Sequence, residues 1–278
     1  MYCSYWQLNE LPFESDGDLS RYVDVPEAAD VRLKLRYLHD HRKAGGVLVG
    51  ESGVGKSYLV RQFAADVRQQ DGDAVRPIVR LVYPRLKPAE LVATLAVRLG
   101  ADPTEADSRS VGLDRLLDLF GQQLHGCHAD RSPILILDDA HTIDDPDVWR
   151  TLRLLMNFRE EDGGRFSLLL LGQNELLGRL GEHPELADRL PVRASVASLS
   201  EASVATYVQT RLTAAGTRAD VFDDDAIAEL TRLSTGVPRR INDLADLSLL
   251  VGMADQFTTV SAESLRAAEN EMRVPSGR

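Results

Sequence analysis

The feature that most restricts the fold of this chain is the sequence Gly50-Glu51-Ser52-Gly53-Val54-Gly55-Lys56-Ser57. It has the form G-x-x-x-x-G-K-S, follows the apolar run 47–49 and precedes apolar residues at helical spacing over 58–63. The glycines open backbone conformations that a Cβ excludes, so successive N–H groups can point at one anion. The positive end of the following helix adds to this field. In this setting the pattern predicts a strand, a phosphate-binding loop and a helix, although the eight residues alone would also fit a glycine-rich turn beside a lysine.

Two side chains at the end of the motif indicate how a nucleotide would be held. Lys56 can reach the β- and γ-phosphates, and the Ser57 hydroxyl can ligate Mg²⁺. We find no N-K-x-D-like element that would read a guanine base, so ATP is favoured over GTP. The residues expected to contact the nucleotide are Gly50, Glu51, Ser52, Gly53, Val54, Gly55, Lys56, Ser57 and Tyr58.

Composition places the chain among soluble globular proteins. Of its 278 residues, 44% are hydrophobic and 27% are charged, which suits one large domain or one medium and one small domain. The longest apolar runs, 134–137 and 168–171, fall far short of the roughly 18 residues of a membrane span. The N-terminus lacks the features of a secretion signal, and Cys3 and Cys127 form no metal or disulfide pattern. We therefore expect a cytoplasmic protein with no membrane span.

The net charge of −11 argues against a protein that coats nucleic acid by charge alone. A modest basic strip over 32–43 fits a solvated helix face better than a nucleic-acid surface. DNA is therefore a partner that the charge disfavours without excluding it.

Apolar runs and helical spacing alternate along the first two thirds of the chain. Strands are expected at 47–49, 77–83, 133–138, 166–171 and 192–199, and helices at 27–43, 56–70, 88–99, 111–125 and 146–159. Continuous apolar strands separated by helices predict a parallel sheet covered on both faces. After residue 199 only helices are expected, at 200–212, 223–233, 238–253 and 261–271. We expect an N-terminal aromatic segment and helix packing on the core (1–45), a nucleotide-binding core (46–199) and a helical domain (200–278).

The N-terminal segment is rich in aromatic residues outside any periodic pattern, among them Tyr5, Trp6 and Phe13. Such residues need a surface to pack on. Two alternatives are open: they pack on the side of the core, or an adenine base lies between this segment and the helical domain.

An apolar strand ends in the carboxylates Asp138 and Asp139, 138 − 56 = 82 residues after Lys56. A carboxylate at this position is what a Mg²⁺-nucleotide site needs opposite the lysine. We expect Asp138 to hold the metal through water, from the strand adjacent to the one before the loop, and Asp139 to polarise the attacking water. His141 is expected to be structural.

Other polar residues follow or precede the predicted strands. Gln173 and Asn174 follow the strand 166–171, where an amide can bond both the γ-phosphate and the lytic water, and we favour Gln173. Arg189 precedes the last strand and could stabilise the γ-phosphate from a neighbouring subunit, or could form a surface ion pair. Arg239 lies in the first turn of a predicted helix, from which it could reach the phosphates, or it is a surface arginine.

Together these residues resemble the AAA+ ATPases, specifically the ExeA/GspA-like group of general secretion pathways, with the regulators of Tn7-type and Mu-type transposition as related ATPases. The resemblance covers nearly the whole chain and rests on an ordered set of motifs. These motifs are Tyr5-Trp6-Gln7-Leu8, Leu11-Pro12-Phe13, Gly50–Ser57, Leu137–His141, Leu171–Leu176, Asp188-Arg189-Leu190, Tyr207 to Leu212, and Gly236-Val237-Pro238-Arg239 with Ile241-Asn242.

The resemblance implies an α/β P-loop fold in three layers, with a five-stranded parallel sheet and a C-terminal helical lid. It implies that Lys56 and Ser57 are the Walker A pair and that Asp138 is the Walker B residue for Mg²⁺. It also implies catalytic roles for the remaining residues: Asp139 as the acid, Gln173 as sensor 1, Arg189 as arginine finger and Arg239 as sensor 2, which also contacts the nucleotide. ATP would bind where subunits of a homo-oligomeric ring or filament meet, so that Arg189 acts in trans.

The chain departs from the family pattern where Asp139 stands in place of the usual glutamate. Its carboxylate is one methylene further from the water, which predicts weak hydrolysis. The sequence-level hypothesis is an ATPase that drives assembly or remodelling of an unidentified protein partner, in a secretion-type pathway. The alternatives are a nucleotide-gated oligomeric scaffold with little turnover, and a DNA-binding adaptor of the transposition type.

Overall fold

The computed structural model describes residues 2–14, 18–72, 76–82, 85–127, 132–161, 165–216 and 219–273. The last residue of the strand expected at 77–83 lies outside these ranges. The chain forms two compact units. The sheet unit comprises Asp30–Glu51 and Leu59–Val196, and the helical unit comprises Met1–Ala29, Ser52–Tyr58 and Ala197–Arg278.

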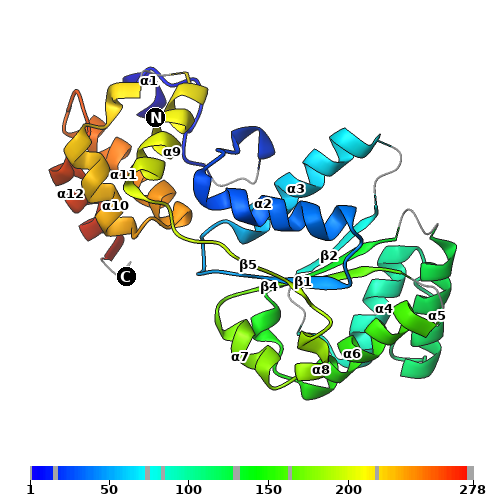
Figure 1. Ribbon diagram of the computed structural model, residues 1–278. Helices are drawn as coiled ribbons and strands as arrows, with labels where there is room; N and C mark the ends of the chain where they lie inside the picture. The colour runs from blue at the N-terminus through cyan, green and yellow to red at the C-terminus, as the bar shows by residue number, and fades with distance from the viewer. Residues whose placement is uncertain are drawn as a thin grey trace. The chain divides into compact units, whose positions relative to one another are not determined.

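Five parallel strands form the sheet of the sheet unit, in the order β2-β3-β4-β1-β5 (Figure 1). Their bounds are β1 Gly45–Val49, β2 Ile78–Val82, β3 Ile134–Asp138, β4 Ser167–Gly172 and β5 Val192–Ser195. Every residue of β1, β3 and β4 is buried, which confirms the parallel sheet covered on both faces. One expectation was wrong: β4 lies between β1 and β3, so the strand that ends in Asp138 is not adjacent to the strand before the loop.

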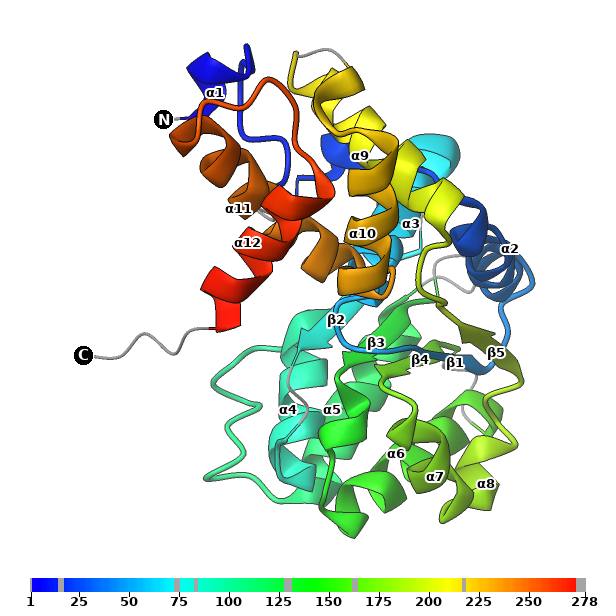
Figure 2. The same ribbon diagram turned by 90° about the vertical axis from the view of Figure 1, so that its left-hand side faces the viewer.

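Helices cover both faces of this sheet, which gives the three layers expected (Figures 1 and 2). The helices α2 and α3 lie on one face, and α4 to α8 lie on the other. Their bounds are α2 Pro26–Asp40, α3 Lys56–Asp71, α4 Pro88–Leu99, α5 Leu113–Gly126, α6 Pro146–Glu161, α7 Glu175–Gly181 and α8 Pro184–Ala187, with a 3₁₀ turn η4 at Ala140–Thr142. The short helices α7 and α8 were not expected.

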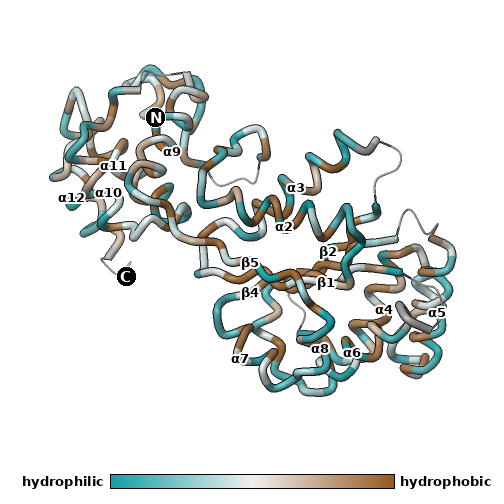
Figure 3. The backbone as a smooth tube through the Cα atoms, viewed as in Figure 1, coloured by the Kyte–Doolittle hydropathy of each residue, from teal (hydrophilic) through white to brown (hydrophobic). Residues whose placement is uncertain are grey.

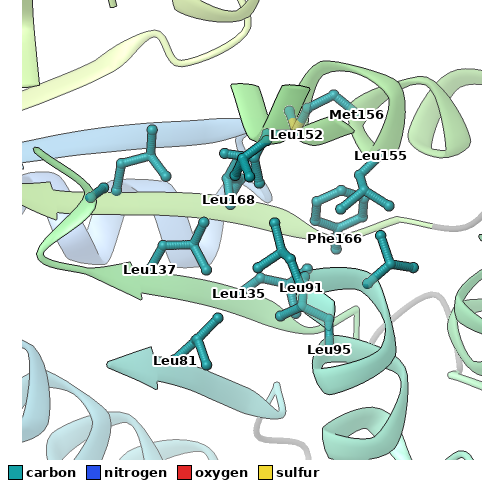
Figure 4. Close-up of a cluster of buried hydrophobic side chains, with 14 of the residues drawn as sticks. Leu81, Leu91, Leu95, Leu135, Leu137, Leu152, Leu155, Met156, Phe166 and Leu168 are labelled. Atoms are coloured by element: carbon teal, nitrogen blue, oxygen red, sulfur yellow. The ribbon is translucent and has the colours of Figure 1, made fainter. Parts of the chain in front are cut away.

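Leucine-rich packing fills the space between the sheet and the helices α4, α5 and α6. Leu135 and Leu168 are partners in the register of β3 and β4 and face helix residues such as Leu91 and Leu152 (Figure 4). Hydrophobic colour gathers on the central strands of the sheet (Figure 3). Burying this surface, at about 25 cal/mol per Å² of apolar area, is the main force that holds the strand ends in place.

The helical unit contains no strand among its described residues, only a single bridge between Phe222 and Val260. Its elements are α1 Tyr2–Tyr5, a 3₁₀ turn η1 Leu19–Arg21, α9 Glu201–Ala214, a 3₁₀ turn η5 Ala219–Val221, α10 Asp224–Ser234, α11 Pro238–Ala254 and α12 Ala262–Arg273. Ser200 caps α9 by accepting from Ser203 N–H, and Asp223 caps α10 by accepting from Ala226 N–H. Pro238 occupies the first turn of α11, as expected.

The N-terminal aromatic residues belong to the core of the helical unit. Tyr2, Trp6 and Phe13 are buried in one cluster with residues of α9 to α12, and the Trp6 indole N–H donates to Leu249 O at 2.9 Å. The buried guanidinium of Arg211 donates to the carbonyls of Pro12, Glu14 and Arg21. The segment thus packs against the C-terminal helices, while the domain boundaries expected from the sequence stay a prediction.

A buried carboxylate ties α10 to α12. Glu229 accepts from Arg232 at 2.7 Å and from Arg266 at 2.7 Å. The hydrogen bonds from Arg232 outweigh burial and, with those from Arg266, lower the pKa of Glu229 to about 2.

Across the described ranges, no helix has both the length and the apolar composition that crossing a membrane requires.

Candidate nucleotide-binding site

The glycine-rich loop connects β1 to α3 and needs glycine at two positions. Gly53 and Gly55 have φ values of 85° and 97°, in the left-handed region that side chains with a Cβ rarely adopt. A Cβ on Gly53 would also lie 3.0 Å from Cβ of Arg239 and 3.1 Å from Cγ1 of Val237. The predicted strand–loop–helix arrangement is therefore present, with glycine where the backbone requires it.

Lys56 opens α3, and Ser57 is the second residue of that helix. Lys56 is only 8% exposed, so bulk water has little access to its side chain. Its attraction for an anion is stronger in this shielded setting than it would be in bulk water. Tyr58 contacts the N-terminal segment: its ring stacks on Tyr22, and its hydroxyl donates to Asp18 O. The loop and its aromatic neighbours thus meet within the helical unit.

Arg239 lies beside the loop, in the first turn of α11. Its backbone N–H donates to Gly53 O at 3.3 Å, which brings the predicted sensor 2 position and the predicted Walker A loop together within the helical unit. The helix is fixed there by Gly236, whose carbonyl accepts from Leu199 N–H at 2.8 Å. Burial raises the pKa of Asp243, one turn further along α11, and the nearby charge of Arg239 opposes that shift.

The two predicted acids end β3 and differ in their surroundings. Asp138 is 3% exposed, and its Oδ1 accepts from the backbone N–H of Asp139 at 3.0 Å. Asp139 adopts a left-handed conformation with φ 55°, which aspartate tolerates better than most residues, and its side chain is 53% exposed. A buried carboxylate for a metal and an exposed one for water fit the roles expected of this pair, which stay predictions.

Sequence reasoning missed Arg80. This residue lies on β2 and forms an ion pair and a hydrogen bond with Oδ2 of Asp138. Its partner in the register of β2 and β3 is Ile136, two residues before Asp138, so the long side chain runs along the strands toward their carboxyl ends. The signal available in the sequence was a single arginine inside the apolar strand 78–82.

Gln173 and His141 connect the predicted sensor 1 position to the acids. The Gln173 amide lies 3.1 Å from His141 Nε2, and His141 Nδ1 lies 4.0 Å from Oδ1 of Asp139. The sequence indicated a structural role for His141 and did not predict its contact with Gln173. Asn174 is exposed at the start of α7 and makes no side-chain cap there.

The structure does not bring Arg189 together with these residues. Arg189 follows α8, and its backbone N–H donates to Leu186 O at 3.0 Å. It precedes β5 and therefore lies at the amino edge of the parallel sheet, whereas Asp138 and Gln173 lie at the carboxyl edge. An arginine finger that acts on its own chain is thus disfavoured, and the expected action in trans stays a prediction.

Each unit carries oxygen donors of the type that Mg²⁺ takes when it binds together with a nucleotide. No group of three or more His, Cys, Asp or Glu side chains that could hold a metal occurs within the ranges that the structure describes. Mg²⁺ prefers oxygen ligands, keeps several waters, and commonly takes one or two protein carboxylates or hydroxyls plus phosphate oxygens. A buried aspartate such as Asp138 and a hydroxyl such as Ser57 are such ligands.

Comparison with protein families matches residues 39–180, about half of the chain, to the AAA domain. Among curated proteins, the chain is 30% identical over 262 residues to General secretion pathway protein A of Aeromonas hydrophila. That alignment covers 91% of the chain and 45% of the relative, so the chain spans about half the length of the curated relative that it matches.

Two solved structures from Aeropyrum pernix share the fold. The ORC1 protein in complex with DNA has a TM-score of 0.71 at 17% identity, over 94% of this chain and 68% of that chain. The ORC2 protein in its ADPNP-ADP complexes has a TM-score of 0.69 at 15% identity, over 97% of this chain and 73% of that chain. At these identities the likeness shows the fold, an α/β sheet in three layers with a helical C-terminal region.

Proposed function

Because this chain belongs to the AAA domain family and is an AAA+ protein of the GspA-like type, we propose that it binds Mg²⁺-ATP and hydrolyses it slowly to drive assembly or remodelling of a protein partner. The observation that carries the proposal is the loop itself. Its positive-φ glycines, its shielded Lys56 and the neighbouring Arg239 form a site that favours polyphosphate over other ligands.

Each group in the proposed site has a defined task in binding. The backbone N–H groups of Ser52–Ser57 and the ammonium group of Lys56 hold the phosphates, and Ser57 and Asp138 hold Mg²⁺. The metal, when bound, neutralises charge that develops on the transferring phosphoryl group. Arg239 lies next to Gly53 and contacts the nucleotide from α11, so that nucleotide binding fixes the helices of the lid.

Hydrolysis needs a water held in line with the γ-phosphate. Asp139 accepts a hydrogen bond from this water, and Gln173 orients it. The shorter Asp139 carboxylate reaches the water less well than glutamate would, so we propose slow turnover. Arg189 reaches the γ-phosphate bound by a neighbouring copy, which makes a homo-oligomeric ring or filament part of the proposal.

The partner is a protein of the cytoplasm in a secretion-type process, by likeness to General secretion pathway protein A. The exposed Asp139 side chain supports a second candidate, a nucleotide-gated scaffold that oligomerises with little turnover. A DNA-binding adaptor is weaker: the related ORC1 structure contains DNA, but this chain carries a net charge of −11.

Calorimetry on the full chain tests the proposal. Wild type should bind ATP in the presence of Mg²⁺ at millimolar concentration or below, and Lys56→Ala should lose most of this affinity. Lys34→Ala is the matched control, since it removes a lysine that pairs with Asp30 on the surface of α2. Absence of ATP binding by wild type would refute nucleotide binding. Phosphate release then separates the slow ATPase from the scaffold, and electron microscopy with ATP, with and without duplex DNA, tests the oligomer.

A further inference from the structure

The Arg80–Asp138 ion pair occupies the carboxylate that the proposed site assigns to Mg²⁺. Oδ2 of Asp138 accepts from the Arg80 guanidinium, and Oδ1 accepts from Asp139 N–H at 3.0 Å. A cation therefore already lies against the carboxylate that the metal or its bound water would contact. Because two cations at one carboxylate repel each other, the guanidinium opposes the binding of Mg²⁺ at this position.

The placement of Arg80 lets its side chain move without disturbing the sheet. Arg98 donates to Arg80 O, so the backbone of β2 is held at this point by α4 as well as by β3. The Arg80 side chain is 28% exposed, which leaves room toward solvent. Its Nε is buried and has no hydrogen-bond partner in the part of the chain that the structure describes. The contact with Asp138 is thus the main one that a rotation would break.

We propose that Arg80 is a positioning residue that competes with Mg²⁺ for Asp138. It holds the buried carboxylate in place in the nucleotide-free protein, and it leaves when Mg²⁺-ATP binds. Arginine remains charged at any pH at which the protein is folded, so the exchange is of one cation for another and is not a proton switch. The residue at position 80 therefore sets how strongly ATP affinity depends on Mg²⁺. This inference rests on the proposed function of the site.

A purely structural ion pair makes a different prediction. If Arg80 only fastened β2 to β3, replacing it would lower stability and would weaken ATP binding equally with and without Mg²⁺. If Arg80 competes with the metal, its removal strengthens binding only where the metal is present. The ratio of ATP dissociation constants without and with Mg²⁺ separates the two cases, because a general loss of folding cancels in the ratio.

The experiment compares wild type, Arg80→Gln, Arg80→Lys and the control Arg85→Gln by calorimetry with ATP, in Mg²⁺ and in EDTA. Arg85 contacts Thr142 O and Asp144 outside the acid pair, so its removal should leave the ratio unchanged. Arg80→Gln should raise the ratio about tenfold, the scale of one lost charge contact. Arg80→Lys keeps the charge and should stay within about threefold of wild type. An unchanged or smaller ratio for Arg80→Gln would overturn the proposal.

A second measurement needs no nucleotide. Mn²⁺, used as a paramagnetic probe for the magnesium position, is titrated into the full chain and followed by electron paramagnetic resonance. Arg80→Gln should bind Mn²⁺ about tenfold more tightly than wild type, and the additional Asp138→Asn change should abolish the gain. If wild type ignores ATP but this gain appears, the proposed function fails while the competition stands. If ATP binds and neither the ratio nor the Mn²⁺ affinity changes, the competition fails while the proposed function stands.

Discussion

Replacing Gly236 with alanine tests how the first turn of α11 is fixed beside the loop. Gly236 has φ 71°, where alanine costs about 1–2 kcal/mol. A Cβ there would lie 2.1 Å from Leu199 O and 3.0 Å from Leu199 N, both backbone atoms. The chain must shift, which loses the Leu199 N–H to Gly236 O hydrogen bond, about 1 kcal/mol, and adds steric strain of about 1–3 kcal/mol. We expect the helical unit to lose about 3–6 kcal/mol of unfolding free energy.

The chain's two tryptophans allow each unit to be followed alone. Trp6 lies in the core of the helical unit and Trp149 in that of the sheet unit. In a Trp149→Phe background, urea unfolding followed by Trp6 fluorescence reports on the helical unit. With a slope of about 2 kcal/mol per molar, Gly236→Ala should lower the midpoint by about 1.5–3 M.

The control for this prediction is Gly178→Ala in α7. Apart from its chain neighbours and the backbone of its own helix, no described residue comes within 4 Å of a Cβ at that position, and alanine favours a helix by about 1 kcal/mol over glycine. Its midpoint, followed by Trp149 in a Trp6→Phe background, should stay the same or rise. Equal midpoints for Gly236→Ala and its own background would refute the argument from the close backbone approach at Leu199.

Three further predictions concern single side chains. Asp139→Glu should raise phosphate release at saturating Mg²⁺-ATP, since the longer carboxylate reaches the water, and a fall in turnover at unchanged ATP affinity would contradict this. Arg232 and Arg266 lower the pKa of Glu229 to about 2, so the stabilisation by this carboxylate is complete above its unfolded pKa near 4.5 and is lost as the pH falls toward 2. The urea midpoint of the helical unit, measured through Trp6 fluorescence, should therefore fall between pH 4.5 and 2, and Glu229→Gln should flatten the curve in this range. Arg76→Met should destabilise the sheet unit by about 1–3 kcal/mol, because it leaves the buried carbonyls of Ser132 and His39 without their donor. Urea unfolding followed by Trp149 fluorescence measures this loss, and an unchanged midpoint would show that these carbonyls find other donors.

Much of the sheet unit follows from the sequence because its strands carry the strongest local signal. The apolar runs that ended in Val49, Asp138 and Leu171 are β1, β3 and β4, with ends displaced by at most two residues. Their spatial order could not be predicted in the same way. In a parallel sheet with helical crossovers, neighbouring positions are set by packing over the whole sheet, so the insertion of β4 between β1 and β3 leaves no trace in either strand.

The sequence points to candidate site residues where the backbone or the chemistry of phosphate requires one residue type. Gly53 and Lys56 are such residues, and Arg239 lies beside Gly53 as its predicted role requires. Arg80 was missed because an arginine within a strand has no partner until the register of β2 and β3 is known. The His141–Gln173 contact was missed for the same reason, since it joins residues that follow different strands.

The helical unit is built from segments that lie far apart in the sequence, which has a consequence for synthesis on the ribosome. Its core joins Tyr2 and Trp6 to helices that end near residue 273, while the segments of the sheet unit are complete once Val196 has emerged. Tyr2 and Trp6 are therefore synthesised long before the helices that cover them in this core. Val237 and Arg239, the neighbours of Gly53, also arrive late. A nascent chain should thus form its sheet before Val237 and Arg239 are available to pack against the glycine-rich loop.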